Sequence, residues 1–343
     1  MNWLITGGCG FVGSNLADAL LERGTSVALL DNLSRHGSRE NLAWLRSRHG
    51  SQWPFFEIDV RDEHAVARVV RQLRPTHLAH LAGQVAMTTS LANPRLDFET
   101  NAGGTLNVLE AVRLGSPETA VYFSSTNKVY GSLDGLRHDE TQTRYVLPDY
   151  PLGLDESLPL DGSSPYGCSK LCAEQYCRDY HRMFGLRTVV FRHSSMYGGR
   201  QFATYDQGWI GWFCQKALEL AAGSREPIEI SGSGKQVRDV LHARDLIQVY
   251  VQAAMRVDAI AGRIYNIGGG MENSLSLVEL FAILRELTGA AMPLRIREWR
   301  VSDQKVFVAD HRRATTDFGW MPGTDHRTGL ANALDWTREL LAA

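Results

Sequence analysis

Short apolar runs alternate with amphipathic stretches through the first half of the chain. The apolar runs are rich in β-branched and aromatic residues and stand at Trp3–Thr6, Ser26–Leu30, Pro54–Ile58, His77–Leu81, Ala120–Phe123 and Thr188–Phe191. Helical spacing of apolar residues marks Asn15–Glu22, Glu63–Leu73, Thr105–Leu114 and Ser169–Phe184. Strands that alternate with helices predict an α/β fold, a doubly wound parallel sheet covered by helices on both faces.

This pattern loosens after Arg192. An aromatic- and glycine-rich stretch is followed by a helix near Phe213–Ala222, a strand near Ile228–Ile230, a helix near Ala243–Met255 and a strand at Arg263–Ile267. The last two elements indicate a return to the sheet. We therefore predict a larger domain made of residues 1–192 and 241–270. Residues 193–240 and 271–343 form a smaller C-terminal substrate-binding lobe in this prediction.

The segment Leu133–Asp161 is polar, contains three prolines and lacks clear periodicity. Long loops inside compact domains are usually functional or disordered. Two interpretations of this segment remain, a lid over the active site and a passive insertion.

Composition sets limits on the partners. The chain has 343 residues, 44% hydrophobic and 22% charged, with a net charge of −2, so we expect neither nucleic acid nor an anionic membrane as partner. The start of the sequence shows no basic leader before a long apolar stretch, and no run approaches the ~20 apolar residues of a membrane helix. These features predict a cytoplasmic protein.

The five cysteines are Cys9, Cys168, Cys172, Cys177 and Cys214. Their number is odd and three crowd one predicted helix, which argues against a disulfide framework. No Cys-x-x-Cys pair with matching histidine spacing suggests zinc, so we expect no metal and interpret the cysteines as small, buried, reduced thiols.

A glycine-rich turn follows the first predicted strand and opens a helix. Its sequence, Gly7-Gly-Cys-Gly10-Phe11-Val12-Gly13, fits both G-x-x-G-x-x-G and G-x-G-x-x-G. Glycines in this context permit a tight turn and let a pyrophosphate approach the backbone at a helix N-terminus. The larger domain is therefore predicted to be a dinucleotide-binding Rossmann domain.

Asp31 ends the second predicted strand, where a carboxylate accepts hydrogen bonds from the adenosine ribose and repels a 2′-phosphate. This favours NAD over NADP, although Arg35 nearby could pair with that phosphate. Asp59-Val60 and Leu81-Ala82 follow the third and fourth strands, at the sheet edge where ligands bind.

Tyr166 and Lys170 stand in the string Ser-Pro-Tyr-Gly-Cys-Ser-Lys. Their spacing of four places both on one helix face. An ammonium beside a phenol stabilises the phenolate, so we expect the pKa of Tyr166 to fall below about 10. Such a tyrosine can take a proton from a sugar alcohol while a nicotinamide takes the hydride.

Together with the hydroxyl-rich strand end Ser124-Ser-Thr126, these motifs resemble the extended short-chain dehydrogenase/reductase family over essentially the whole chain. The resemblance implies that Thr126, Tyr166 and Lys170 are catalytic, that Lys170 also bonds the nicotinamide ribose, and that Asp59 contacts adenine. The cofactor site predicted in this way comprises Gly7, Gly10, Phe11, Val12, Gly13, Asp31, Asn32, Ser34, Arg35, Asp59, Val60, Leu81, Ala82, Gln84, Asn101, Ser124, Tyr166, Lys170 and His193.

Three longer strings, 81–90, 124–131 and 191–208, look like those of the CDP-tyvelose (CDP-paratose) 2-epimerases of that family. The implied reaction inverts C2 of a CDP-hexose and serves lipopolysaccharide O-antigen synthesis. Dehydratases of the family carry Asp-Glu directly after the catalytic threonine, whereas Asn127 and Lys128 stand here. Elimination would lack its proton donor and acceptor, which argues against a dehydratase.

A CDP-sugar carries a pyrophosphate, and a guanidinium suits two phosphate oxygens at once. The resemblance makes Arg238 the leading phosphate contact, with Arg300 and Arg200 as further candidates. The substrate site predicted on this basis comprises Thr126, Ser195, Arg200, Gln207, Arg238, Arg300 and Asp303.

Two other functions stay open. One is an epimerase of the same fold that acts on another nucleotide sugar, such as a UDP-hexose 4-epimerase. The other is a non-catalytic NAD-sensing protein. Such a protein is expected to lack part of the catalytic set, whereas Thr126, Tyr166 and Lys170 are all present here. The family suggests a homo-oligomer, a dimer or tetramer, and the sequence fixes neither the sugar nor the nucleotide.

Overall fold

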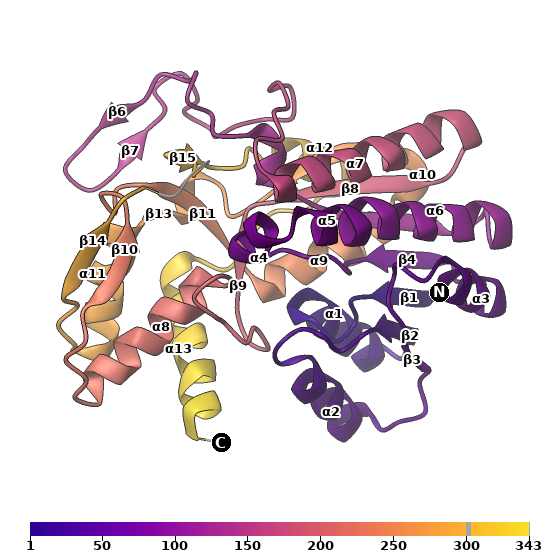
Figure 1. The fold of residues 1–343 in the computed structure, drawn as a ribbon, viewed down its shortest axis with the longest axis horizontal. Helices are drawn as coiled ribbons and strands as arrows, with labels where there is room; N and C mark the ends of the chain where they lie inside the picture. The colour runs from indigo at the N-terminus through magenta and orange to yellow at the C-terminus, as the bar shows by residue number, and fades with distance from the viewer. Residues whose placement is uncertain (300–302, 343) are drawn as a thin grey trace.

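A seven-stranded sheet forms the centre of the computed structural model, which describes residues 1–299 and 303–342 (Figure 1). All its strand pairs are parallel, in the order β12-β8-β5-β4-β1-β2-β3. The strands are β1 (Asn2–Thr6), β2 (Ser26–Asp31), β3 (Phe55–Glu57), β4 (His77–His80), β5 (Ala120–Thr126), β8 (Thr188–His193) and β12 (Ile264–Ile267). The predicted fold class is confirmed, and β5 and β8 extend further than predicted.

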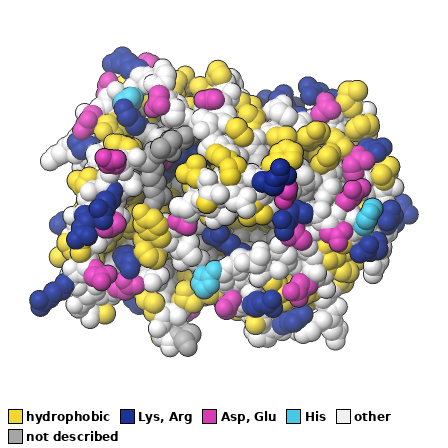
Figure 2. Space-filling view, viewed as in Figure 1, with side chains coloured by type: hydrophobic (Ala, Val, Ile, Leu, Met, Phe, Trp, Pro, Cys, Tyr) yellow, Lys and Arg dark blue, Asp and Glu magenta, His cyan; other side chains and the backbone are white. Residues whose placement is uncertain are grey.

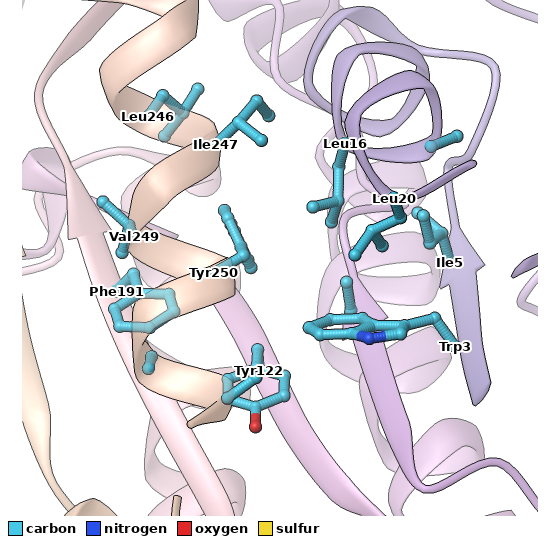
Figure 3. Packing of buried hydrophobic residues seen from close by; sticks show 14 of the residues in the cluster. Trp3, Ile5, Leu16, Leu20, Tyr122, Phe191, Leu246, Ile247, Val249 and Tyr250 are labelled. Carbon is cyan, nitrogen blue, oxygen red and sulfur yellow. The ribbon is translucent and has the colours of Figure 1, made fainter. Parts of the chain in front are cut away.

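Successive side chains of a strand point to opposite sides of the sheet. Apolar side chains on both sides pack against helices, so both faces of the sheet are buried. Trp3 and Ile5 pack on one face with Tyr122 and with residues of two helices, as Figure 3 shows. The helices of this face are α1 (Phe11–Glu22), α2 (Ser38–His49) and α9 (Ala243–Ala254). Leu4 packs on the other face with Phe123. That face is covered by α3 (Glu63–Leu73), α6 (Gly104–Gly115) and α7 (Pro165–Phe184).

The smaller lobe has its own apolar core around Phe213, Leu280 and Leu330. Strand β11 (Val237–His242) pairs with β9 (Ser195–Tyr197), β13 (Ser274–Ser276) and β15 (Val306–Phe307). A second, two-stranded sheet joins β10 (Ile228–Ser231) to β14 (Leu294–Arg297). The helices of the lobe are α8 (Trp209–Ala221), α11 (Leu277–Thr288) and α13 (His326–Ala342).

Short elements connect these parts. They are α4 (Met87–Ala92), α5 (Pro94–Asp97), the π-helix η1 (Phe98–Gly103), the 3₁₀-helices η2 (Asn127–Tyr130) and η3 (Met271–Asn273), α10 (Val257–Ile260) and α12 (Arg312–Phe318). In and after α12, Ala314, Phe318 and Trp320 pack into the core of the larger domain. The domain division stays a prediction, and this packing argues for moving residues 312–320 into the larger domain.

Helix α2 was not predicted from the sequence. Its residues are mostly polar, and among its apolar residues only Leu42 and Leu45 are fully buried against α1, so the periodic signal is weak. The expectation that all cysteines are buried is also wrong, because Cys168 is exposed on α7.

The segment 133–161 contains the hairpin β6 (Asp139–Glu140) and β7 (Tyr145–Val146), which packs on the smaller lobe. Arg144 donates to Glu279 at 2.8 Å, and the backbone N–H of Tyr145 donates to the carbonyl of Lys235 at 2.9 Å. Further along, Leu154 exchanges backbone hydrogen bonds with Val308 and Asp310. These contacts support a fixed insertion over a freely moving lid.

Basic and acidic side chains are interspersed on the face drawn in Figure 2, consistent with the net charge of −2. Within the part of the chain that the structure describes, no helix has both the length and the apolar character needed to span a membrane.

Candidate active site

The carboxyl ends of the central strands open into a cavity of about 600 Å³. This position, next to the point where the strand order reverses between β1 and β4, is where doubly wound sheets bind ligands. Most residues predicted to bind the cofactor line it, namely Gly7, Gly10, Phe11, Val12, Gly13, Asp31, Asn32, Ser34, Arg35, Asp59, Val60, Leu81, Ala82, Gln84 and Ser124. Three residues predicted to bind the substrate, Ser195, Arg200 and Gln207, also line it.

The glycine turn forms the floor of this cavity. Gly7 has a φ of +68°, and a Cβ on it would lie 2.6 Å from the backbone nitrogen of Ala82. A Cβ on Gly13 would lie 2.2 Å from the carbonyl oxygen of Gly7. Helix α1 begins at Phe11 with no side-chain cap on its first N–H groups. These free donors and the positive end of the helix fit a pyrophosphate.

Asp31 lies at the end of β2 and is only 8% exposed. Its carboxylate accepts hydrogen bonds from the backbone N–H of Cys9 (2.9 Å) and of Leu33 (2.8 Å). Burial raises its pKa, and these two hydrogen bonds oppose the rise. Because each carboxylate oxygen has a second acceptor site, Asp31 can still accept hydrogen bonds from a ribose.

Asp59 and its neighbours form the wall predicted to contact adenine. Asp59 pairs with Arg61 at 2.8 Å and accepts a hydrogen bond from Asn32 at 2.9 Å, and the hydroxyl of Ser34 donates to Asn32 at 2.7 Å. The hydrogen bond from Arg61 lowers the pKa of Asp59 to about 2. Asp59 is therefore ionised, paired with a cation and already held in place by its own contacts.

The structure brings Thr126, Tyr166 and Lys170 together. Thr126 ends β5, while Tyr166 and Lys170 lie one turn apart on α7, whose N-terminus is capped by Ser164. A hydrogen bond joins the side chains of Thr126 and Tyr166. The ammonium of Lys170 donates to the carbonyl of Ser124 at 2.8 Å.

The expectation that Lys170 lowers the pKa of Tyr166 is wrong in this geometry. Burial raises the pKa of Tyr166 to about 12, the hydrogen bond from Thr126 lowers it, and the charge of Asp97 raises it. Burial also lowers the pKa of Lys170 to about 8. Desolvation disfavours both charged forms, which spacing along the helix cannot reveal.

An ion pair beneath the catalytic residues was missed from the sequence. Glu174, one turn after Lys170, pairs with Arg192 of β8 and accepts a hydrogen bond from Ser125 of β5 at 3.0 Å. The side chains of Glu174 and Arg192 are 0% and 3% exposed. This pair joins α7 to the two strands that end at the site. Its sequence signal was the arginine that directly follows the apolar run Thr188–Phe191.

Four predicted cofactor contacts do not line this cavity: Tyr166 and Lys170, described above, and also Asn101 and His193. Asn101 is 1% exposed and exchanges hydrogen bonds with the backbone of Gln84, and it also donates to Ser169. Its amide is held by protein partners, and a direct contact with the cofactor stays a prediction. Nε2 of His193 bonds the hydroxyl of Tyr250 at 3.0 Å, whereas its buried Nδ1 has no partner among the described residues. Burial lowers the pKa of His193 to about 3, so the ring is neutral.

The predicted phosphate contacts differ in their surroundings. Arg238 pairs with Asp303 at 2.7 Å, and Asp303 also pairs with Lys128 at 3.3 Å. Lys128, which was not predicted as a substrate contact, follows Thr126 by two residues, so two cations and one anion lie beside the catalytic residues. Arg300 lies outside the described residues.

Arg200 lies elsewhere, on the side of the cavity near the start of α2. Its guanidinium donates to the side chain of Asn41 at 2.9 Å and lies over the rings of Trp44 and Trp336, at 4.7 and 4.4 Å from the ring centres. These partners occupy the guanidinium, and a phosphate contact by Arg200 stays a prediction.

Comparisons with known proteins agree with this geometry. Residues 3–268 match the NAD dependent epimerase/dehydratase family. The chain is 53% identical over 340 residues to the CDP-paratose 2-epimerase of Salmonella typhi, covering 99% of this chain and 100% of that protein. A UDP-glucose 4-epimerase of Thermotoga maritima, solved with UDP-glucose, has a TM-score of 0.84 at 29% identity, covering 99% of this chain and 100% of that one. The Thermus thermophilus UDP-glucose 4-epimerase, solved with NAD, has a TM-score of 0.80 at 29% identity, covering 98% and 99%. The chain therefore belongs to the NAD dependent epimerase/dehydratase family.

Proposed function

We propose that this enzyme inverts C2 of a CDP-hexose and converts CDP-paratose to CDP-tyvelose. The observation that carries the proposal is the 53% identity to a CDP-paratose 2-epimerase along the full length of both chains. The assembled Thr126, Tyr166 and Lys170 support an active enzyme over a non-catalytic NAD sensor.

The structure of the sugar limits the route. Paratose has no hydroxyl at C3, and a ketone at C4 would acidify C3 and C5 but not C2. Proton abstraction at C2 would therefore lack an adjacent carbonyl. Oxidation of the C2 alcohol itself gives a 2-keto sugar, which can be reduced from its other face.

Tyr166 accepts the proton of the C2 hydroxyl during oxidation and returns it during reduction, while Thr126 donates a hydrogen bond that stabilises the ionised phenol. Bound NAD supplies the hydride acceptor and donor, and the positive charge of its oxidised ring favours ionisation of Tyr166. Lys170 donates to the carbonyl of Ser124, which lines the cavity, and in this proposal it also bonds the nicotinamide ribose.

The keto sugar must turn over between the two hydride transfers. Arg238 and Lys128, which both pair with Asp303, are the cations that suit the two phosphates of CDP. Firm contacts to the diphosphate leave the hexose free to rotate, and the binding energy then comes from a part of the substrate that the reaction leaves unchanged.

The test is CDP-paratose that carries deuterium at C2. Deuterium retained at C2 of the tyvelose product supports direct hydride return. Replacement by solvent hydrogen would contradict the mechanism, and faster epimerisation of UDP-glucose than of CDP-paratose would contradict the substrate. The homo-oligomer and the cytoplasmic location stay predictions.

A further inference from the structure

A ten-residue segment, 199–208, connects β9 to α8 and crosses the cofactor cavity. In Figure 1 the loop between β9 and α8 reaches toward α1, on the side of the larger domain. The residues of the segment that line the cavity are Arg200, Gln201, Phe202, Gln207 and Gly208. The smaller lobe thus contributes a wall to a site whose floor belongs to the sheet.

Phe202 packs against the loop that follows β2. Gly37 of that loop has a φ of +84°, and a Cβ on it would lie 2.1 Å from the Phe202 ring. The ring also meets the rings of His36 and Trp336 edge-on, each at 5.8 Å between centres. Only glycine at position 37 admits this contact, which links the segment to the adenosine side of the cavity.

Arg200 fixes the start of the segment. It is a non-glycine residue with a φ of +67°, a region that such residues rarely adopt. Its contacts with Asn41, Trp44 and Trp336 surround the side chain and stabilise this backbone conformation.

Asp206 links the other end of the segment to the larger domain. The hydroxyl of Thr88, on α4, donates to its carboxylate at 2.5 Å. Burial lowers the pKa of Arg35, and the charge of Asp206 opposes that change, so the two groups attract each other. One carboxylate therefore joins the segment to α4 and to the loop after β2.

We propose that segment 199–208 is a clasp that retains NAD through many turnovers. Release of the dinucleotide requires Phe202 to leave Gly37 and Asp206 to leave Thr88. The chemical reason is that an epimerase returns its hydride to the same sugar, and loss of the reduced cofactor would leave a keto sugar unreduced. The proposal depends on the NAD cofactor of the family and on no particular sugar.

The test measures cofactor release from the full-length protein without substrate, so it is independent of the sugar assignment. Protein loaded with NADH is mixed with excess NAD, and the loss of bound NADH fluorescence gives the dissociation rate. We expect Phe202→Ala to speed release on the order of tenfold or more, since such changes act mainly on dissociation. Phe184→Ala, at an exposed aromatic residue on α7, is the matched control and should leave the rate unchanged.

Surface variants keep the test decisive if Phe202→Ala folds poorly. Thr88→Val removes one exposed hydrogen bond with little change of shape and should speed release severalfold. Asp206→Ala removes the acceptor of that hydrogen bond and should have at least the same effect, and the double variant should release NADH no faster than Asp206→Ala alone, because both changes break the same contact. Release within twofold of the unchanged protein, in folded Phe202→Ala or in Thr88→Val, would overturn the clasp.

Discussion

Replacing Glu174 by alanine tests whether the buried ion pair supports the catalytic helix. The carboxylate of Glu174 is fully buried and accepts hydrogen bonds from Nε of Arg192 and from the hydroxyl of Ser125, both at 3.0 Å. After the substitution, the guanidinium stays buried, bonded to the hydroxyl of Tyr130 at 2.7 Å. A buried charge that has lost its counter-ion is the main cost.

Removal of one partner of a buried pair costs about 3–5 kcal/mol of the free energy of unfolding. Glu174→Gln keeps a hydrogen-bond acceptor and loses the charge, so about 1.5–3 kcal/mol is expected for it. Since Glu174 lies two turns after Tyr166 on α7, kcat should fall in both variants even where they are fully folded.

Urea unfolding followed by circular dichroism measures the change in the free energy of unfolding. The NAD concentration is kept the same for all variants, because bound ligand shifts the apparent stability. Asp179→Asn on the same helix is the matched control. It breaks an exposed pair with Arg182 and should change stability by less than about 0.5 kcal/mol. A Glu174→Ala protein within about 1 kcal/mol of the unchanged one would refute the reasoning.

Two further predictions concern the catalytic tyrosine and the pH. Tyr166→Phe should lower kcat by about 10²–10⁴-fold while NAD stays bound. Turnover measures the first effect, and the amount of cofactor released on denaturation measures the second. Near-normal turnover would exclude Tyr166 as the proton acceptor. Burial lowers the pKa of His77 to about 4 and of His80 and His193 to about 3. Below about pH 6.5 the unfolded chain therefore binds more protons than the folded protein does. Each histidine should lower the free energy of unfolding by about 2 kcal/mol at pH 5. Equal urea midpoints at pH 7 and pH 5 would contradict this.

The cofactor turn and the catalytic spacing were determined by local sequence. Gly7 and Gly13 occupy positions where a Cβ would collide with backbone atoms, and that restriction is visible in the sequence. Tyr166 and Lys170 share a helix face because of their spacing alone. The alternation of strands and helices also fixed the fold class, since both faces of the sheet require apolar residues.

Only the tertiary structure decided what surrounds these groups. Desolvation raised the pKa of Tyr166, although the neighbouring lysine predicted the opposite. Arg200, predicted as a phosphate contact, lies over the rings of Trp44 and Trp336, from α2 and α13. Burial and ring contacts arise from segments far apart in the chain, so no local pattern encodes them. The electrostatics of the site and the residues that enclose its cofactor cavity therefore depend on packing.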